Sequence, residues 1–143
     1  LNHAENPMTM AELSKTIARA RELGIETIAC ADSLAEGTAI AAFRPDILLC
    51  EPTDLIGTGK TADDSYTTSI VAKIRSIDPT IGIMIASGIT TADDVYRVVR
   101  LGADGSGATS GILSAPDPAQ RILEMAEAIM RAAAEREAQN SAA

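Results

Sequence analysis

The chain has 143 residues, which fits one domain, and its 46% apolar and 22% charged residues are typical of an ordinary globular protein. The net charge of -8 argues against a nucleic-acid-binding surface, and no apolar run approaches the ~18 residues that span a bilayer, so we expect neither nucleic acid nor membrane as a partner. The only cysteines, Cys30 and Cys50, lie in apolar runs as small hydrophobes do, which predicts a reducing, cytoplasmic setting without a disulfide or a zinc site.

Helix and strand patterns alternate through the first third of the chain. The first helix begins with a capping box formed by Thr9 and Glu12. The second strand reads DILLCE and is apolar on both faces, the pattern of a buried parallel strand. The order is helix, strand, helix and strand, at residues 9–24, 25–31, 34–43 and 46–51.

The same alternation continues to the C-terminus. It predicts helix, strand, helix, weak strand and helix, at residues 66–77, 81–86, 91–101, 104–111 and 122–133. Residues 135–143 form a tail that we expect to fray. Strands alternating with helices across short loops mean a parallel sheet with right-handed crossovers. We therefore predict a single α/β domain over residues 1–143, with four strand–helix units and a short remnant of a strand before His3.

Two residues with acid–base chemistry follow strand positions. Glu51 ends the strand DILLCE, and His3, the only histidine, ends the N-terminal remnant. The carboxyl ends of parallel strands face the ligand site in open sheets and in barrels, so both side chains are expected on one rim, with one strand between theirs. A partly desolvated glutamate there is suited to act as a general base. By position alone, a solvated glutamate and a structural histidine remain the commoner interpretation.

A glycine-rich loop follows Glu51 and ends in Gly59-Lys60-Thr61, as a nucleotide-binding P-loop does. Asp54 stands where that motif requires its first glycine, and its carboxylate would oppose a triphosphate, so we reject the P-loop. Gly57 and Gly59 suit a loop that changes conformation and offers amides to an anion, although a static turn is equally compatible.

Small residues also follow the third and fourth strand positions, where they allow either close ligand approach or tight strand–helix packing. They are Gly88 and residues 109–111.

Taken together, four segments resemble the second half of triosephosphate isomerase, in its archaeal-type branch: LNHAEN, EPTDLIGTG, SGITTADDV and TSGILSAPDP. The resemblance runs in register from Leu1 to about Met130, in the order of that family, from the end of strand four through strand eight. It implies a (β/α)8 TIM barrel, of which this chain carries the C-terminal half, with about four βα units.

The resemblance also implies an aldose–ketose isomerase that interconverts dihydroxyacetone phosphate and glyceraldehyde 3-phosphate. Glu51 is then the base that removes a carbon-bound proton, His3 the neutral imidazole that polarises the carbonyl, and Glu5 a supporting carboxylate. A lid over residues 56–62 would close on the substrate, with Lys60 pointing to solvent. Such chemistry needs no metal and no cofactor, and we find ligands for neither. The phosphate would be held by Ile56, Gly57, Gly88, Thr109 and Ser110.

The chain departs from the family in three ways. An Asn-x-Lys after strand one has no counterpart here, Ala4 replaces the usual serine after His3, and the strand-eight segment GSGAT is more polar than the aliphatic version of the family. A half barrel also exposes two strand edges and one apolar sheet face. Because Leu1 begins inside a motif, we expect an incomplete copy of a longer protein that forms a homo-oligomer when full length.

Two rival hypotheses remain. The chain could be a non-catalytic phosphate-binding half barrel, as the missing lysine favours. An aldolase would require a Schiff-base lysine at a strand end, and the three lysines do not lie there: Lys15, Lys60 and Lys73.

Overall fold

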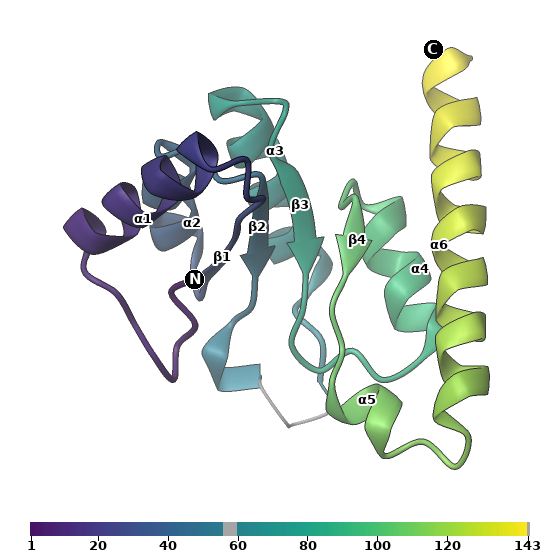
Figure 1. The fold of residues 1–143 in the computed structure, drawn as a ribbon. Coiled ribbons are helices and arrows are strands. Elements are labelled where there is room, and N and C mark those ends of the chain that lie inside the picture. The colour runs from purple at the N-terminus through teal and green to yellow at the C-terminus, as the bar shows by residue number, and fades with distance from the viewer. Residues whose placement is uncertain (56–59, 143) are drawn as a thin grey trace.

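A computed structural model describes residues 1–55 and 60–142. Its centre is a four-stranded sheet in the order β1-β2-β3-β4, with every pair of neighbours parallel (Figure 1). The strands are β1 Ile28–Ala31, β2 Ile47–Cys50, β3 Gly82–Ile85 and β4 Gly105–Ser106. Each connection between neighbouring strands contains an α-helix: α2 Leu34–Ala41, α3 Asp64–Ile77 or α4 Ala92–Arg100. The connection from β2 to β3 also contains the 3-10 helix Thr53–Leu55. The predicted α/β architecture with parallel strands is confirmed.

The N-terminal residues extend this sheet at the β1 edge. The Leu1 amino group donates to Ile28 O at 2.7 Å, and Cys30 N donates to Leu1 O at 2.9 Å. This alternation of donor and acceptor about one residue is the hydrogen-bond pattern of parallel strands. The strand remnant predicted before His3 therefore lies where a fifth neighbouring strand would lie. Helix α1, Met10–Glu22, follows it and begins with the predicted capping box.

The chain ends in α5, Ser110–Leu113, and the long helix α6, Pro118–Ser141. Residues 135–141, for which the sequence predicted a frayed tail, form the last turns of α6. Glu135 accepts a hydrogen bond from Tyr96 at 2.6 Å, and Arg136 donates to Val99 O and Ala103 O. These contacts tie the first two residues of that segment to α4 and the loop after it, which a local sequence pattern could not reveal.

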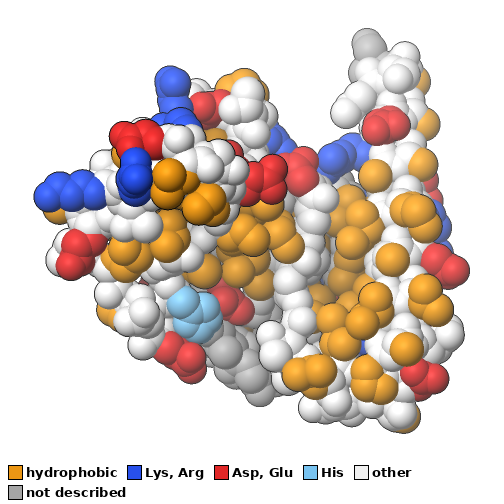
Figure 2. Space-filling view, viewed as in Figure 1, with side chains coloured by type: hydrophobic (Ala, Val, Ile, Leu, Met, Phe, Trp, Pro, Cys, Tyr) orange, Lys and Arg blue, Asp and Glu red, His pale blue; other side chains and the backbone are white. Residues whose placement is uncertain are grey.

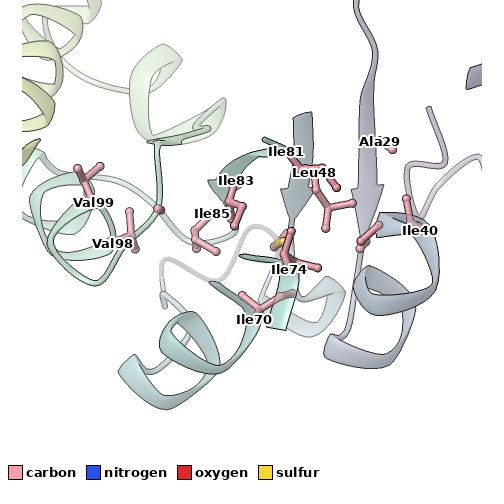
Figure 3. Close-up of a cluster of buried hydrophobic side chains, with 14 of the residues drawn as sticks. Ala29, Ile40, Leu48, Ile70, Ile74, Ile81, Ile83, Ile85, Val98 and Val99 are labelled. Carbon is pink, nitrogen blue, oxygen red and sulfur yellow. The ribbon is translucent and has the colours of Figure 1, made fainter. Parts of the chain in front are cut away.

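Aliphatic side chains fill the space between the sheet and its helices (Figure 3). Leu48, Ile83 and Ile85 point from β2 and β3 into this core, where they meet Ile70 and Ile74 of α3. Alternate residues of the same strands point the other way because strand side chains alternate between faces. No helix of the described residues is long and apolar enough to cross a bilayer.

The face of the sheet opposite the core is apolar and open. Ile28 is 45% exposed, and Ile47, Leu49 and Met84 are only partly buried. Figure 2 shows hydrophobic side chains gathered over this face and along α6. DILLCE is therefore buried on one side only, whereas its pattern predicted burial on both, and the open face is the one expected of half a barrel.

Candidate functional site

Glu51 directly follows β2 and lies at the carboxyl edge of the sheet. Its backbone amide donates to Ala31 O at 2.8 Å, which continues the pairing with β1 by one residue. Strand alternation places its side chain on the same side as Leu49, toward the open face. That side chain is 18% exposed. The strand thus delivers a carboxylate that is largely withdrawn from solvent yet borders the surface.

His3 lies beside this carboxylate, as the sequence predicted. Its Nε2 is 3.5 Å from Glu51 Oε2, and its side chain is 42% exposed. Its Nδ1 accepts a hydrogen bond from the backbone amide of Glu5 at 3.2 Å. Because one nitrogen of a neutral imidazole donates and the other accepts, this bond assigns the proton to Nε2, on the side facing Glu51. The imidazole can therefore donate a hydrogen bond next to the Glu51 carboxylate.

Glu5 is far less enclosed than His3 and Glu51. Its Oε2 is 3.9 Å from His3 Nδ1, and its side chain is 86% exposed. Its backbone amide contacts the ring more closely than its carboxylate does. The structure brings Glu5 next to His3, but its firmest contact is made by the main chain.

The turn after β3 requires glycine at Gly88. Its φ is +68°, and a Cβ at this position would lie 1.9 Å from the carbonyl oxygen of Lys60. Gly111 is equally restricted, because its Cβ would lie 2.3 Å from Ile89 O in the preceding turn. Side chains at these two positions would push apart three backbone segments. The glycines therefore allow the loops that follow β2, β3 and β4 to meet, and Lys60 itself is exposed as predicted.

One cavity of about 550 Å³ joins these features, which is within the usual size range for small-molecule sites. Its lining includes all six predicted site residues that the structure describes: His3, Glu5, Glu51, Gly88, Thr109 and Ser110. The other two, Ile56 and Gly57, lie outside the described residues, as does Gly59.

The cavity is acidic rather than basic. Its described lining carries the carboxylates of Glu5 and Glu51 and contains neither lysine nor arginine. In the part of the chain that the structure describes, no three His, Cys, Asp or Glu side chains are grouped so as to hold a metal ion. An anionic ligand would therefore depend here on backbone amides and on the imidazole.

Sequence reasoning missed two residues beside the site, Asn2 and Ser87. Both have a positive φ, 57° and 73°, and both are nearly buried. Ser87 Oγ donates to Pro52 O at 3.0 Å and so holds the carbonyl group of the residue that follows Glu51. A positive φ at a non-glycine residue leaves no mark in a hydrophobicity pattern, and only the position of each residue at a strand end could have drawn attention to it.

Comparison with known proteins identifies a family for this chain. Residues 1–129 match the model of the triosephosphate isomerase family. Triosephosphate isomerase of Metallosphaera sedula is 35% identical over 95% of this chain and 60% of its own length. Those of Sulfurisphaera tokodaii and Methanobrevibacter smithii are 34% and 35% identical over 87% of this chain, and over 55% and 58% of their own lengths. The chain thus spans little more than half the length of these relatives.

Solved structures support the fold alone. A chain of the BexX/CysO complex of Amycolatopsis orientalis superimposes with a TM-score of 0.67 at 17% identity, over 91% of this chain and 52% of that one. Mandelate oxidase with benzoyl-formic acid gives a TM-score of 0.63 at 15% identity, over 88% of this chain and 38% of that one. The family match covers most of the sequence, from residue 1 to residue 129. The chain belongs to the triosephosphate isomerase family.

Proposed function

We propose that the protein to which this chain belongs interconverts dihydroxyacetone phosphate and glyceraldehyde 3-phosphate. The observation that carries the proposal is the 3.5 Å separation of His3 Nε2 and Glu51 Oε2 in a cavity that the turns after β3 and β4 also line. Proton abstraction next to a carbonyl requires one base, one hydrogen-bond donor at the carbonyl oxygen and a site from which water can be excluded.

In the proposed reaction, Glu51 removes a proton from the hydroxymethyl carbon of dihydroxyacetone phosphate. The electron pair of that C–H bond forms the enediolate double bond, and the carbonyl oxygen becomes the oxyanion. His3 stabilises the oxyanion through its Nε2 proton and relays a proton between the two oxygens. Glu51 then returns its proton to the neighbouring carbon, which yields the aldehyde. Protons are only relocated, so the reaction calls for no cofactor.

The remaining roles follow the same proposal. Glu5 supports the imidazole, chiefly through its backbone amide. The substrate phosphate is held by amides of Gly88, Thr109 and Ser110 together with those of Ile56 and Gly57, which lie outside the described residues. The partner is thus a small-molecule triose phosphate. The complete protein is proposed to be cytoplasmic and to assemble as a homo-oligomer.

One observation favours a second function for the isolated 143 residues, a non-catalytic phosphate-binding half barrel. The described cavity lining carries two carboxylates and no basic residue, and the strand-one lysine that the family resemblance implies has no counterpart in the chain. Without that cation, the charge of a bound substrate is offset only by amide dipoles and by the His3 imidazole.

A binding experiment separates the two functions. We would titrate the chain with 2-phosphoglycolate, which mimics the enediolate and its phosphate, and with inorganic phosphate. A site shaped for the transition state binds the mimic on the order of 100-fold or more tightly than a simple ligand. Equal affinity for the two anions favours the non-catalytic function. A Glu51→Gln variant should weaken binding of the mimic and leave phosphate binding unchanged.

Isomerase activity is then measured on the complete enzyme. Glu51→Asp withdraws the carboxylate by one methylene, and because misplacement by about 1 Å can cost 100-fold, we expect kcat to fall by one to two orders of magnitude. Glu26→Asp makes the same change at an exposed residue just before β1, at the opposite end of the strand from the site, and serves as the control. An unaltered rate in Glu51→Asp would rule out Glu51 as the base.

A further inference from the structure

Asn2, the residue before His3, has an unusual backbone and an enclosed side chain. Its φ is 57°, and it is only 6% exposed. Left-handed backbone is unfavourable for most L-residues, and asparagine is among the few that adopt it readily. The conformation turns the chain sharply away from the sheet edge, so that the next residue, His3, leaves β1 and points toward β2.

The Asn2 amide group makes three hydrogen bonds. Its Nδ2 donates to Cys30 O at 3.2 Å and to Glu36 Oε1 at 2.9 Å, and its Oδ1 accepts from Met8 N at 2.9 Å. The other oxygen of Glu36 accepts from Asp32 N at 2.8 Å. Because the partners of Nδ2 are acceptors and the partner of Oδ1 is a donor, the amide has one favourable orientation. It joins the end of β1, the first turn of α2 and the far end of the His3 loop.

Three successive residues at the end of β1 anchor the site. Cys30 O holds the side chain of Asn2, Ala31 O holds the backbone of Glu51, and Asp32 N holds the carboxylate that supports Asn2. Hydrogen bonds to the same short backbone segment therefore position both His3 and Glu51. Any loosening of Asn2 from this piece moves His3 relative to Glu51.

We infer that Asn2 is a positioning residue, held in turn by Glu36, that fixes the orientation of the His3 imidazole relative to Glu51. The catalytic meaning of this assignment rests on the proposed isomerase function. The positioning itself does not, because it concerns contacts within the folded chain and can be measured without turnover. Replacing Asn2 by aspartate would set a carboxylate against Glu36 Oε1 and Cys30 O, so two attractive contacts become repulsive ones.

The single histidine of the chain makes the test direct, because ¹⁵N-labelled histidine gives one pair of imidazole signals. In buffer at about pH 9, where imidazoles are neutral, the wild-type chain is expected to show the tautomer protonated on Nε2, because Nδ1 accepts the hydrogen bond from Glu5 N. In Asn2→Asp the ring should shift toward the tautomer mixture of a free histidine amide in the same buffer. Asn6→Asp introduces the same charge at an exposed site in the same loop and should leave the ring unchanged.

A double variant that moves the negative charge from residue 36 to residue 2 tests the Glu36 contact. Combining Asn2→Asp with Glu36→Gln exchanges donor and acceptor and restores one hydrogen bond, so the tautomer distribution should return toward that of wild type. If Asn2→Asp does not fold, Asn2→Gly keeps the positive φ while removing the side chain, and the same shift is expected.

A folded Asn2→Asp or Asn2→Gly chain with wild-type imidazole signals would overturn the inference. A double variant no closer to wild type than Asn2→Asp would refute the part played by Glu36. Neither outcome depends on isomerase activity, so failure of the proposed function would leave this result readable. If that function holds, Asn2→Asp in the complete enzyme should lower kcat on the order of 10-fold to 100-fold with little change in KM.

Discussion

Gly88 offers a matched comparison that tests how the turn after β3 holds Lys60. Gly24 and Gly88 share a φ of +68°, but a Cβ at Gly24 meets nothing within 4 Å, whereas a Cβ at Gly88 would lie 1.9 Å from Lys60 O. Alanine at either position forces an L-residue into left-handed backbone, at a cost of about 1–2 kcal/mol. Only alanine at Gly88 also creates a collision. The difference between the two variants therefore isolates the contact with Lys60.

The size of that difference follows from the geometry. A carbon–oxygen contact is normally no closer than about 3.3 Å, so the Lys60 backbone would have to retreat by roughly 1.4 Å. Forcing extra atoms into a packed region typically costs about 1–3 kcal/mol. We expect Gly24→Ala to lower the free energy of unfolding by about 1–2 kcal/mol and Gly88→Ala by about 2–5 kcal/mol.

Urea denaturation measures both values, and limited trypsin digestion reports on the site directly. Cleavage after Lys60 should accelerate in Gly88→Ala relative to cleavage at other basic residues, and it should not accelerate in Gly24→Ala. Binding of 2-phosphoglycolate should weaken in Gly88→Ala only. Equal loss of stability in the two variants, with unchanged cleavage after Lys60, would refute the argument.

Three further predictions concern other parts of the chain. Burial raises the pKa of the Cys50 thiol to about 12, whereas Cys30 is partly exposed. Iodoacetamide should therefore modify Cys30 in the native protein and Cys50 only after unfolding. Equal rates of alkylation at the two cysteines, measured by mass spectrometry, would contradict this. Burial would raise the pKa of Asp94, but hydrogen bonds from the two threonines before α4 outweigh it and lower that pKa. This contribution to stability is present above the unfolded pKa of about 3.9 and is lost as pH falls through the folded pKa. Asp94→Asn should therefore be less stable than wild type near neutral pH, and the difference in unfolding free energy should shrink below about pH 4. A difference that stays constant down to about pH 2 would be inconsistent with this argument. Arg97 donates to the carbonyl of the buried Ala62 at 2.9 Å. Arg97→Ala should therefore lower the free energy of unfolding, measured by urea denaturation, by about 1–3 kcal/mol. A loss below about 0.5 kcal/mol would show that water replaces the guanidinium.

Local signals determined most of the secondary structure. The capping box of α1 is present as predicted, and α4 spans Ala92–Arg100 within the predicted residues 91–101. The weak strand position 104–111 is reduced to Gly105–Ser106, because glycine-rich polar residues provide few side chains to pack on a sheet. Capping and periodicity act over a few residues, which is why they can be interpreted without the fold.

Burial on the helix faces was less predictable. Met10, Ile77 and Ile122 belong to the apolar faces of their helices, yet they are 41%, 36% and 51% exposed. Periodicity identifies the side of a helix that turns inward, but the extent of the opposing surface decides which residues on it are covered. Here the short strands and the open face of the sheet leave the ends of those faces uncovered.

In the candidate site, too, some features follow from the sequence and others only from packing. The sequence by itself determined that a histidine, a glutamate and two glycine turns each follow a strand position. Parallel strands bring such residues to one edge of the sheet. Only the tertiary structure decided that His3 presents Nε2 to Glu51 and that Gly88 lies against the Lys60 backbone. It also decided that the Asn2 side chain donates a hydrogen bond to Cys30 O of β1. These contacts join residues between 28 and 48 positions apart, and their geometry depends on distances of tenths of an ångström that only packing of the whole sheet can fix.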